Sequence, residues 1–355
     1  MADPSPLARA LGLQAQACIV FGSAFSGALM NKAAEDVESA GPTASVLAAW
    51  TGDSAGSLFR DAVPIRLLGA LHAFALSGDA PALSGAYPAA NRAGDAEAAW
   101  AEGRRLIQAY PQRFIEFMDH EPQTNEVRRS ACLIGGFLTV AQETGLPLRC
   151  FEVGASAGLN QLWDRFHYRL GDAGTWGDDG SPVDIDTDWR GLPPPLAASV
   201  NVIERAACDR RPVNIADPAA RARLRAYVWA DQLDRMNRLD AAIALALADG
   251  VSVETEDAVT WTTARAAPRA GAATVLYHSV FWQYMPADSQ AALLAAIQAH
   301  GAAASGQAPF AWLRMEPPPN DLANMELRVT LWPGGEDRLL ARVHPHGAEV
   351  NWGAT

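Results

Sequence analysis

The spacing of apolar residues divides the chain near residue 147. Before that point apolar positions recur at three- and four-residue steps and alternating β-branched runs are almost absent, which is typical of helices. The clearest predicted helices are 64–76, ended by SGDAP, and 95–110, closed by Pro111. The uncharged stretch 11–31 is expected to be a core helix, because glutamines, serines and glycines dilute it too far for a membrane span. Residues 1–147 are therefore predicted to form an all-helical domain.

After residue 147 short apolar runs end in turn residues and alternate with helical stretches, which is the pattern of an open parallel α/β sheet. A long helical segment, 218–248, is expected between the second and third strands, and 171–198 is expected to be a surface insertion. The predicted strands are 148–153, 199–204, 251–255, 274–278 and 310–315, followed by 326–332 and 338–343 as an antiparallel hairpin around PGGED. Residues 148–355 are thus predicted to form an α/β domain with a mostly parallel sheet.

Composition limits the possible partners. The 355 residues are 49% apolar and 19% charged, which excludes a disordered chain, and the net charge of −12 opposes binding to nucleic acid. The four cysteines lie far apart without a CxxC pair, so they are interpreted as reduced thiols rather than as a zinc or redox site. The sequence favours a cytoplasmic protein with a small-molecule partner and neither a metal site nor a membrane segment.

One segment carries the candidate chemistry, LRCFEVGASAGLNQLWDRF. An apolar strand runs into Gly154, Ser156 and Gly158, after which the spacing is helical. Glycines permit positive φ and a close backbone approach, and the first amides of a helix face a ligand above the strand ends. Because open α/β sheets bind ligands at their carboxyl edge, a cleft is expected above Gly154.

The same turn has a hydrolase interpretation. As GxSxG it is a nucleophile elbow with Ser156 exposed, and Asp257 and His278 follow in the order of an α/β-hydrolase triad. Against this, the preceding residues look helical, no HGGG-type oxyanion loop precedes the turn, and a hydrolase does not need an acid at Glu152.

As ExGxSxG, the turn resembles the first motif of class I S-adenosylmethionine-dependent methyltransferases, with Ser156 at a position where glycine is usual. A carboxylate at Glu152 suits a ligand with a positive sulfonium and ammonium, whereas a phosphate site would avoid that charge. The resemblance implies a Rossmann-like fold and an S-adenosylmethionine site that includes Glu152, Gly154, Ser156, Gly158 and Asn160.

Downstream segments extend this resemblance. In ETEDAVTW, Asp257 would meet the adenine edge, and the acid that holds the ribose hydroxyls would be Asp209 rather than Glu204. Three features depart from the family: the serine in the glycine motif, the separation of 257 − 152 = 105 residues between Glu152 and Asp257, and the short connection between WLRMEP and the last hairpin.

The acceptor side is expected to lie where TVLYHSVFWQYM ends. His278 is a candidate general base, although a histidine on an apolar strand is also often a hydrogen-bonded core residue. Tyr284 and Glu316 are candidate catalytic groups, and Trp282 a candidate acceptor contact, although aromatic residues after a strand are commonly core residues. The polar cluster of Gln123, Asn125 and Glu126 is interpreted either as a helix cap or as a loop that projects into the cleft.

The whole chain also resembles a bacterial family catalogued as domain of unknown function 2332. The shared segments are PIRLLGALHAFALSG, QTNEVRRSA, FEVGASAGLN, VWADQLDRM, YHSVFWQYM and WLRMEP. This resemblance implies a methyltransferase-like domain, and methyl transfer to a small molecule is the leading expectation. The alternatives are a ligand-binding module without catalysis on the same scaffold, and a serine hydrolase using Ser156.

Overall fold

The computed structural model describes residues 3–318, 321 and 324–353. Contacts divide the chain into a helical unit, residues 3–124 with 216–237, and an α/β unit, residues 125–215 with 238–353. The boundary expected at residue 147 therefore moves to 124/125. The reason is α9 (Ser130–Thr144), which is buried against strands of the sheet and belongs to the α/β unit.

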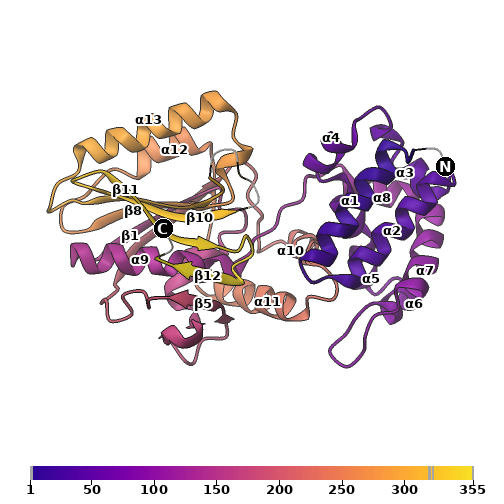
Figure 1. Cartoon of the computed structure of the whole chain (residues 1–355), viewed down its shortest axis with the longest axis horizontal. Coiled ribbons are helices and arrows are strands. Elements are labelled where there is room, and N and C mark those ends of the chain that lie inside the picture. Colours follow the sequence, from indigo (N-terminus) through magenta and orange to yellow (C-terminus); the bar gives the residue numbers. More distant parts are fainter. Residues whose placement is uncertain (1–2, 319–320, 322–323, 354–355) are drawn as a thin grey trace. The chain divides into compact units, whose positions relative to one another are not determined.

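The helical unit is built around one core of buried apolar residues from nearly all of its helices. The expected helix at 64–76 is present as α5 (Val63–Ser77), and that at 95–110 as α7 (Ala96–Ala109), whose first turn is capped by the Asp95 side chain. The unit's other α-helices are α1 (Pro6–Val20), α2 (Ala24–Glu38), α3 (Pro42–Val46), α4 (Ala55–Arg60), α6 (Pro81–Ala86), α8 (Pro111–Met118) and α10 (Pro218–Ala226) (Figure 1).

Two segments expected to be single helices are broken. The stretch 11–31 contains the end of α1 and the start of α2, separated by a turn in which Gly22 has φ 82°. The segment 218–248 contains α10 and α11 (Leu233–Ala248). Between them Asp231 accepts hydrogen bonds from the Ser23 hydroxyl and the Phe25 amide, so the two breaks meet in the helical unit. Helical periodicity alone does not reveal such a tertiary contact.

The α/β unit contains a nine-stranded sheet in the order β5-β12-β11-β10-β9-β8-β1-β6-β7. The five strands from β7 to β9 are parallel, and β10 and β11 form the expected antiparallel hairpin. The bounds are β1 (Leu148–Val153), β5 (Asp188–Gly191), β6 (Val202–Asp209), β7 (Glu254–Thr255), β8 (Ala273–Ser279), β9 (Phe310–Glu316), β10 (Met325–Trp332), β11 (Glu336–Val343) and β12 (Glu349–Trp352). The unit is thus α/β with a large, mostly parallel sheet.

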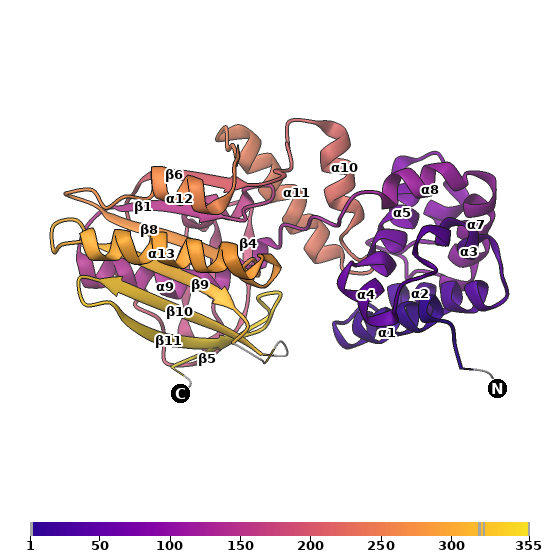
Figure 2. The same cartoon turned by 90° about the horizontal axis from the view of Figure 1, so that it is seen from above.

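Helices cover both faces of this sheet. Figure 1 and Figure 2 show α12 (Ala258–Arg265) and α13 (Ala287–Ala303) over one face and α9 against the other. All six residues of β1 are buried, as expected of a central parallel strand. Within the described residues, no helix combines the length and apolar character needed to cross a bilayer.

The region expected to be a surface insertion, residues 171–198, contains short β-strands. A small sheet of order β3-β2-β4 is formed by β2 (His167–Arg169), β3 (Thr175–Gly177) and β4 (Asp184–Asp186). The next strand, β5, pairs in parallel with β12 at the edge of the main sheet. These strands and β12 cannot be recognised in the sequence, because they are only three or four residues long and lack an apolar run.

Candidate functional site

The candidate site begins at the end of the central strand β1. Glu152 is 3% exposed, and its Oε2 lies 3.3 Å from the hydroxyl of Tyr277 on β8. Burial raises the pKa of Glu152 to about 8, with an opposing effect of the Tyr277 hydrogen bond and a further increase from the negative charge of Asp209. The carboxyl group is therefore mostly protonated at pH 7 and would become ionised if a cation came near.

The loop after β1 has the special backbone that its sequence predicts. Gly154, Ser156 and Gly158 have φ of 68°, 55° and 72°, and a serine rarely adopts this region. Asp209, at the end of β6, holds the loop: its Oδ2 accepts from the Ser156 amide at 2.9 Å and its Oδ1 from the Arg211 amide at 2.9 Å. Asp209 thus supports the loop, and neither oxygen is left without a protein donor.

The helix expected after the loop is absent as an α-helix. Residues Leu159–Arg165 form the 3-10 segment η3, with non-helical backbone angles at Leu162. The segment is fastened at its start, where Asn125 Oδ1 accepts from the Leu159 amide at 2.9 Å and Asn160 Nδ2 donates to the Glu126 carbonyl at 3.3 Å. These contacts hold the start of η3, which is a 3-10 segment in place of the expected α-helix.

The residues of the polar cluster Gln123, Asn125 and Glu126 fall into different parts of the structure. Asn125 and Glu126 belong to the α/β unit and contact the start of η3, Asn125 through its side-chain oxygen and Glu126 through its backbone carbonyl. Glu126 also acts as a cap, because its Oε1 accepts from the Arg128 amide at 3.1 Å at the start of η2 (Val127–Arg129). Gln123 belongs to the helical unit.

Asp257 is the N-cap of α12. Its Oδ1 accepts from the amides of Val259 and Thr260, each at 3.0 Å. Hydrogen bonds from Thr260 and Val259 hold the pKa of Asp257 below its usual value. The residue therefore has a complete structural role, and an adenine contact would have to use its other oxygen.

His278 and Glu316 form a buried pair at the ends of β8 and β9. His278 is fully buried, and its Nδ1 lies 2.7 Å from Glu316 Oε1. Trp312 Nε1 donates to His278 Nε2 at 3.0 Å, and an indole nitrogen can only donate. Nδ1 therefore carries the hydrogen, and both ring nitrogens are engaged. His278 does not fit the expected role of general base, because no free nitrogen faces a substrate.

Glu316 Oε1 also accepts from the amides of Phe281 and Trp282, at 2.8 and 3.2 Å. Oε2 of the same carboxylate is buried without a hydrogen-bond partner. Trp282 is half-buried and stacks on His278 with ring centroids 5.8 Å apart. Tyr284, expected to be catalytic, is 72% exposed, whereas His278 and Glu316 are buried.

Phe281 is the site residue that sequence reasoning missed. A Cβ built on Gly154 would clash with the Phe281 ring, so this ring fills the space beside the loop that glycine leaves open. The ring also packs edge-on against His278, with centroids 5.5 Å apart. A positive φ of 53° at Val280, immediately before it, turns the chain toward the loop. The sequence pattern, an aromatic residue after a strand, does not predict this contact with the loop.

The structure brings most of the expected residues to one edge of the sheet. Hydrogen bonds or ring contacts join them through the loop, η3 and the turn after β8: Glu152, Gly154, Ser156, Asn160, Asp209, His278, Trp282, Glu316, Asn125 and Glu126. Among the described residues of this set, Ser156 Oγ, Asn160 Oδ1 and Glu316 Oε2 are buried without a hydrogen-bond partner. They are the atoms best suited to contact a bound ligand.

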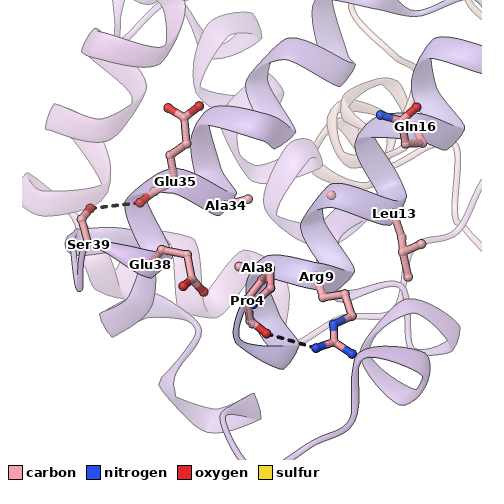
Figure 3. Close-up of a pocket in the computed structure, with 10 residues that line it drawn as sticks. Pro4, Ala8, Arg9, Leu13, Gln16, Ala34, Glu35, Glu38 and Ser39 are labelled. Carbon is pink, nitrogen blue, oxygen red and sulfur yellow. Dashed lines mark hydrogen bonds between the residues drawn. The ribbon is translucent and has the colours of Figure 1, made fainter. Parts of the chain in front are cut away.

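Two hollows lie outside this set. A pocket of about 290 Å³ on the α/β unit is lined mainly by η3, β6 and the approach to β7, including Gln161, Arg205 and Ser252. In the helical unit, an open, mainly apolar groove of about 770 Å³ lies along α1 and α2, where Figure 3 shows Arg9, Leu13 and Glu38 around it. None of the site residues expected from the sequence lines either hollow.

The fold and site define an α/β protein with a glycine-containing loop and a buried acid at the carboxyl end of the central strand. The chain belongs to the family described as uncharacterized proteins conserved in bacteria, DUF2332, whose model matches residues 8–352. Comparisons with curated proteins and with solved structures found no match.

Proposed function

We propose that the α/β unit binds S-adenosylmethionine and that the protein transfers its methyl group to a small molecule. The observation that carries this proposal is the buried Glu152 carboxyl at the end of β1, followed in the loop and in η3 by two buried polar atoms without partners, Ser156 Oγ and Asn160 Oδ1. A cationic ligand would favour the ionised carboxylate in this low-dielectric position. The strand order, with β1 central among five parallel strands, supports a ligand at this edge.

The bound cofactor would supply an electrophilic methyl group on a positive sulfur. Glu152, Ser156 and Asn160 would contact it, while Gly154 and Gly158 give the loop its shape. Asp209 would act through the loop, because both of its oxygens accept backbone amides. For Asp257, the same argument favours a capping role with an indirect effect on binding.

The acceptor side would lie at the ends of β8 and β9. His278 is proposed to position Glu316 rather than to remove a proton, because both of its nitrogens are engaged. Glu316 Oε2, a buried oxygen without a partner, is the acceptor for a donor group on the substrate. Trp282 would form an aromatic wall, and the exposed Tyr284 would contribute only from the rim.

A second candidate is a ligand-binding module without catalysis. It is favoured by the engaged nitrogens of His278 and by the Phe281 ring against Gly154. The hydrolase alternative has less support. A nucleophilic serine needs a base within hydrogen-bonding distance, whereas Ser156 Oγ has no partner and His278 is committed to Glu316 and Trp312.

Calorimetry on the full chain tests the proposal with S-adenosylmethionine and S-adenosylhomocysteine as ligands. We expect both to bind the natural protein and to bind Glu152→Gln at least about tenfold more weakly, since about 1.4 kcal/mol corresponds to that factor. Glu336→Gln removes an exposed carboxylate on β11 and should leave affinity unchanged. Absence of binding by both ligands refutes the proposal. Binding without turnover on a panel of small amines, alcohols and acids would favour the module.

A further inference from the structure

The turn after β8 is strained and is held from several sides. Val280 has φ 53°, a region that a β-branched residue adopts only when its surroundings impose it. Its amide donates to the Met315 carbonyl at 2.9 Å. The side chain of Gln290 on α13 donates to the carbonyls of Trp282 and Met285 at 3.0 and 3.1 Å. The backbone of the turn is thus well defined.

Glu316 is the common acceptor at the start of this turn. One oxygen, Oε1, receives the His278 ring N–H and the amides of Phe281 and Trp282. Hydrogen bonds to an ionised acceptor are stronger than those between neutral groups. His278 is in turn fixed by the Trp312 indole N–H, so the carboxylate has one orientation. The three donors converge on it from β8 and from the turn.

The consequence of this arrangement is the position of Phe281. Its ring fills the space that Gly154 leaves beside the loop, and Gly154 would otherwise be the point of closest backbone approach for a ligand. We propose that Glu316 is a positioning residue: by holding the strained turn at Val280, it sets the Phe281 ring against Gly154 and keeps the loop closed until a ligand displaces the ring. The ligand part of this inference rests on the proposed cofactor site.

A closed majority state lowers apparent affinity by the fraction of molecules that are open. Calorimetry with S-adenosylhomocysteine is therefore applied to the natural chain, Phe281→Ala, Glu316→Gln and the double variant. We expect Phe281→Ala to bind about tenfold more tightly than the natural chain and Glu316→Gln to bind more tightly as well. The double variant should bind no more tightly than Phe281→Ala, because both changes act through the same ring.

Glu336→Gln is the matched control and should bind as the natural chain does. Unchanged or weaker binding by Phe281→Ala overturns the inference, and so does a Glu316→Gln effect that adds fully to it. The Phe281→Ala result decides by itself if Glu316→Gln does not fold, since Phe281→Ala removes no side-chain hydrogen bond.

Residue-resolved hydrogen exchange without ligand separates this inference from the proposed function. Glu316→Gln should speed exchange at the amides of Phe281 and Trp282, and Phe281→Ala should speed exchange in the loop 154–158. If no variant binds S-adenosylhomocysteine, the cofactor proposal fails and exchange alone decides. Faster loop exchange in Phe281→Ala then supports the closed loop, whereas unchanged exchange in both variants contradicts it.

Discussion

Asn125 and Leu159 are 34 residues apart, yet the Asn125 side-chain oxygen accepts a hydrogen bond from the Leu159 amide at 2.9 Å. This contact joins the two most distinctive polar segments of the sequence, the cluster before α9 and the loop after β1. The side chain acts as a cap, but for η3 rather than for the helix that follows it in the chain. The loop is therefore held at two points. Asp209 accepts from the Ser156 amide within the loop, and Asn125 accepts from the Leu159 amide directly after it.

The first prediction concerns this cap. Asn125→Ala should destabilise the α/β unit by about 1 kcal/mol, because the Leu159 amide loses its acceptor. Asn125→Asp retains an acceptor oxygen and should lose much less. Urea unfolding of the full chain measures both, with the exposed Thr124→Ala as a neutral neighbour. Equal losses in Asn125→Ala and Asn125→Asp would show that the side-chain acceptor is not the cause.

The second prediction concerns the positive φ of Ser156. Ser156→Gly should stabilise the protein by about 0.5 to 1 kcal/mol, since relief of a left-handed conformation exceeds the extra backbone entropy of glycine. Ser156→Ala retains the Cβ and should show no such gain. Thermal and urea unfolding measure the stability of both variants against the natural chain. A Ser156→Gly variant that is less stable than the natural chain would show that the backbone at Ser156 is not strained.

The third prediction concerns the pH dependence that Glu152 imposes. Its folded pKa of about 8 lies above the usual glutamate pKa of 4.5, so the folded state holds the proton more tightly than the unfolded state. Its contribution to stability is complete below pH 4.5 and declines up to pH 8, by at most about 1.4 kcal/mol per pH unit. Glu152→Gln should flatten this decline in urea titrations, and an unchanged slope would rule out a buried, neutral carboxyl.

The fourth prediction concerns the helical unit, where burial lowers the pKa of His72 to about 4. Its ring lies 3.2 Å from the Ala226 carbonyl and stacks on Tyr87. Because the folded pKa lies below 6.5, stability contributed by the neutral ring is lost as pH falls from 6.5 to 4.

His72→Gln should remove this acid sensitivity, while His120→Gln, at an exposed position, should retain it. Helix content followed by circular dichroism against urea at several pH values provides the measurement. Identical acid sensitivity in His72→Gln and the natural chain would locate the titrating group elsewhere.

The parallel half of the sheet was largely readable from the sequence. The bounds of β1 agree with the predicted strand at 148–153, because Pro147 precedes and Gly154 follows a short segment whose other residues are apolar apart from Arg149 and Glu152. The second strand was placed at 199–204 but spans Val202–Asp209, since β6 contains a glutamate, an arginine and an aspartate among its apolar residues. Its pairing with β1, rather than its own pattern, fixes its length.

The site was readable only in part, for a physical reason. Glu152, Asp209 and Asn125 were selected as candidates because polar groups at strand ends and before helices stand out from their surroundings. Which atoms they use was not readable, because it depends on contacts between distant segments, such as Asp209 with the Ser156 amide. Phe281 could not be recognised in this way. An aromatic residue in an apolar stretch has the same sequence pattern whether it packs in a core or fills the space beside a glycine.

The Glu152 carboxyl is proposed to receive a cationic cofactor. At pH 7 this group is mostly protonated in the closed protein, so binding of S-adenosylmethionine should release about one proton. Binding enthalpies in phosphate and in Tris at pH 7 should then differ by about the difference between the ionisation enthalpies of the two buffers, and this difference should vanish in Glu152→Gln. Binding with the same enthalpy in both buffers, or a difference that persists in Glu152→Gln, would contradict the account.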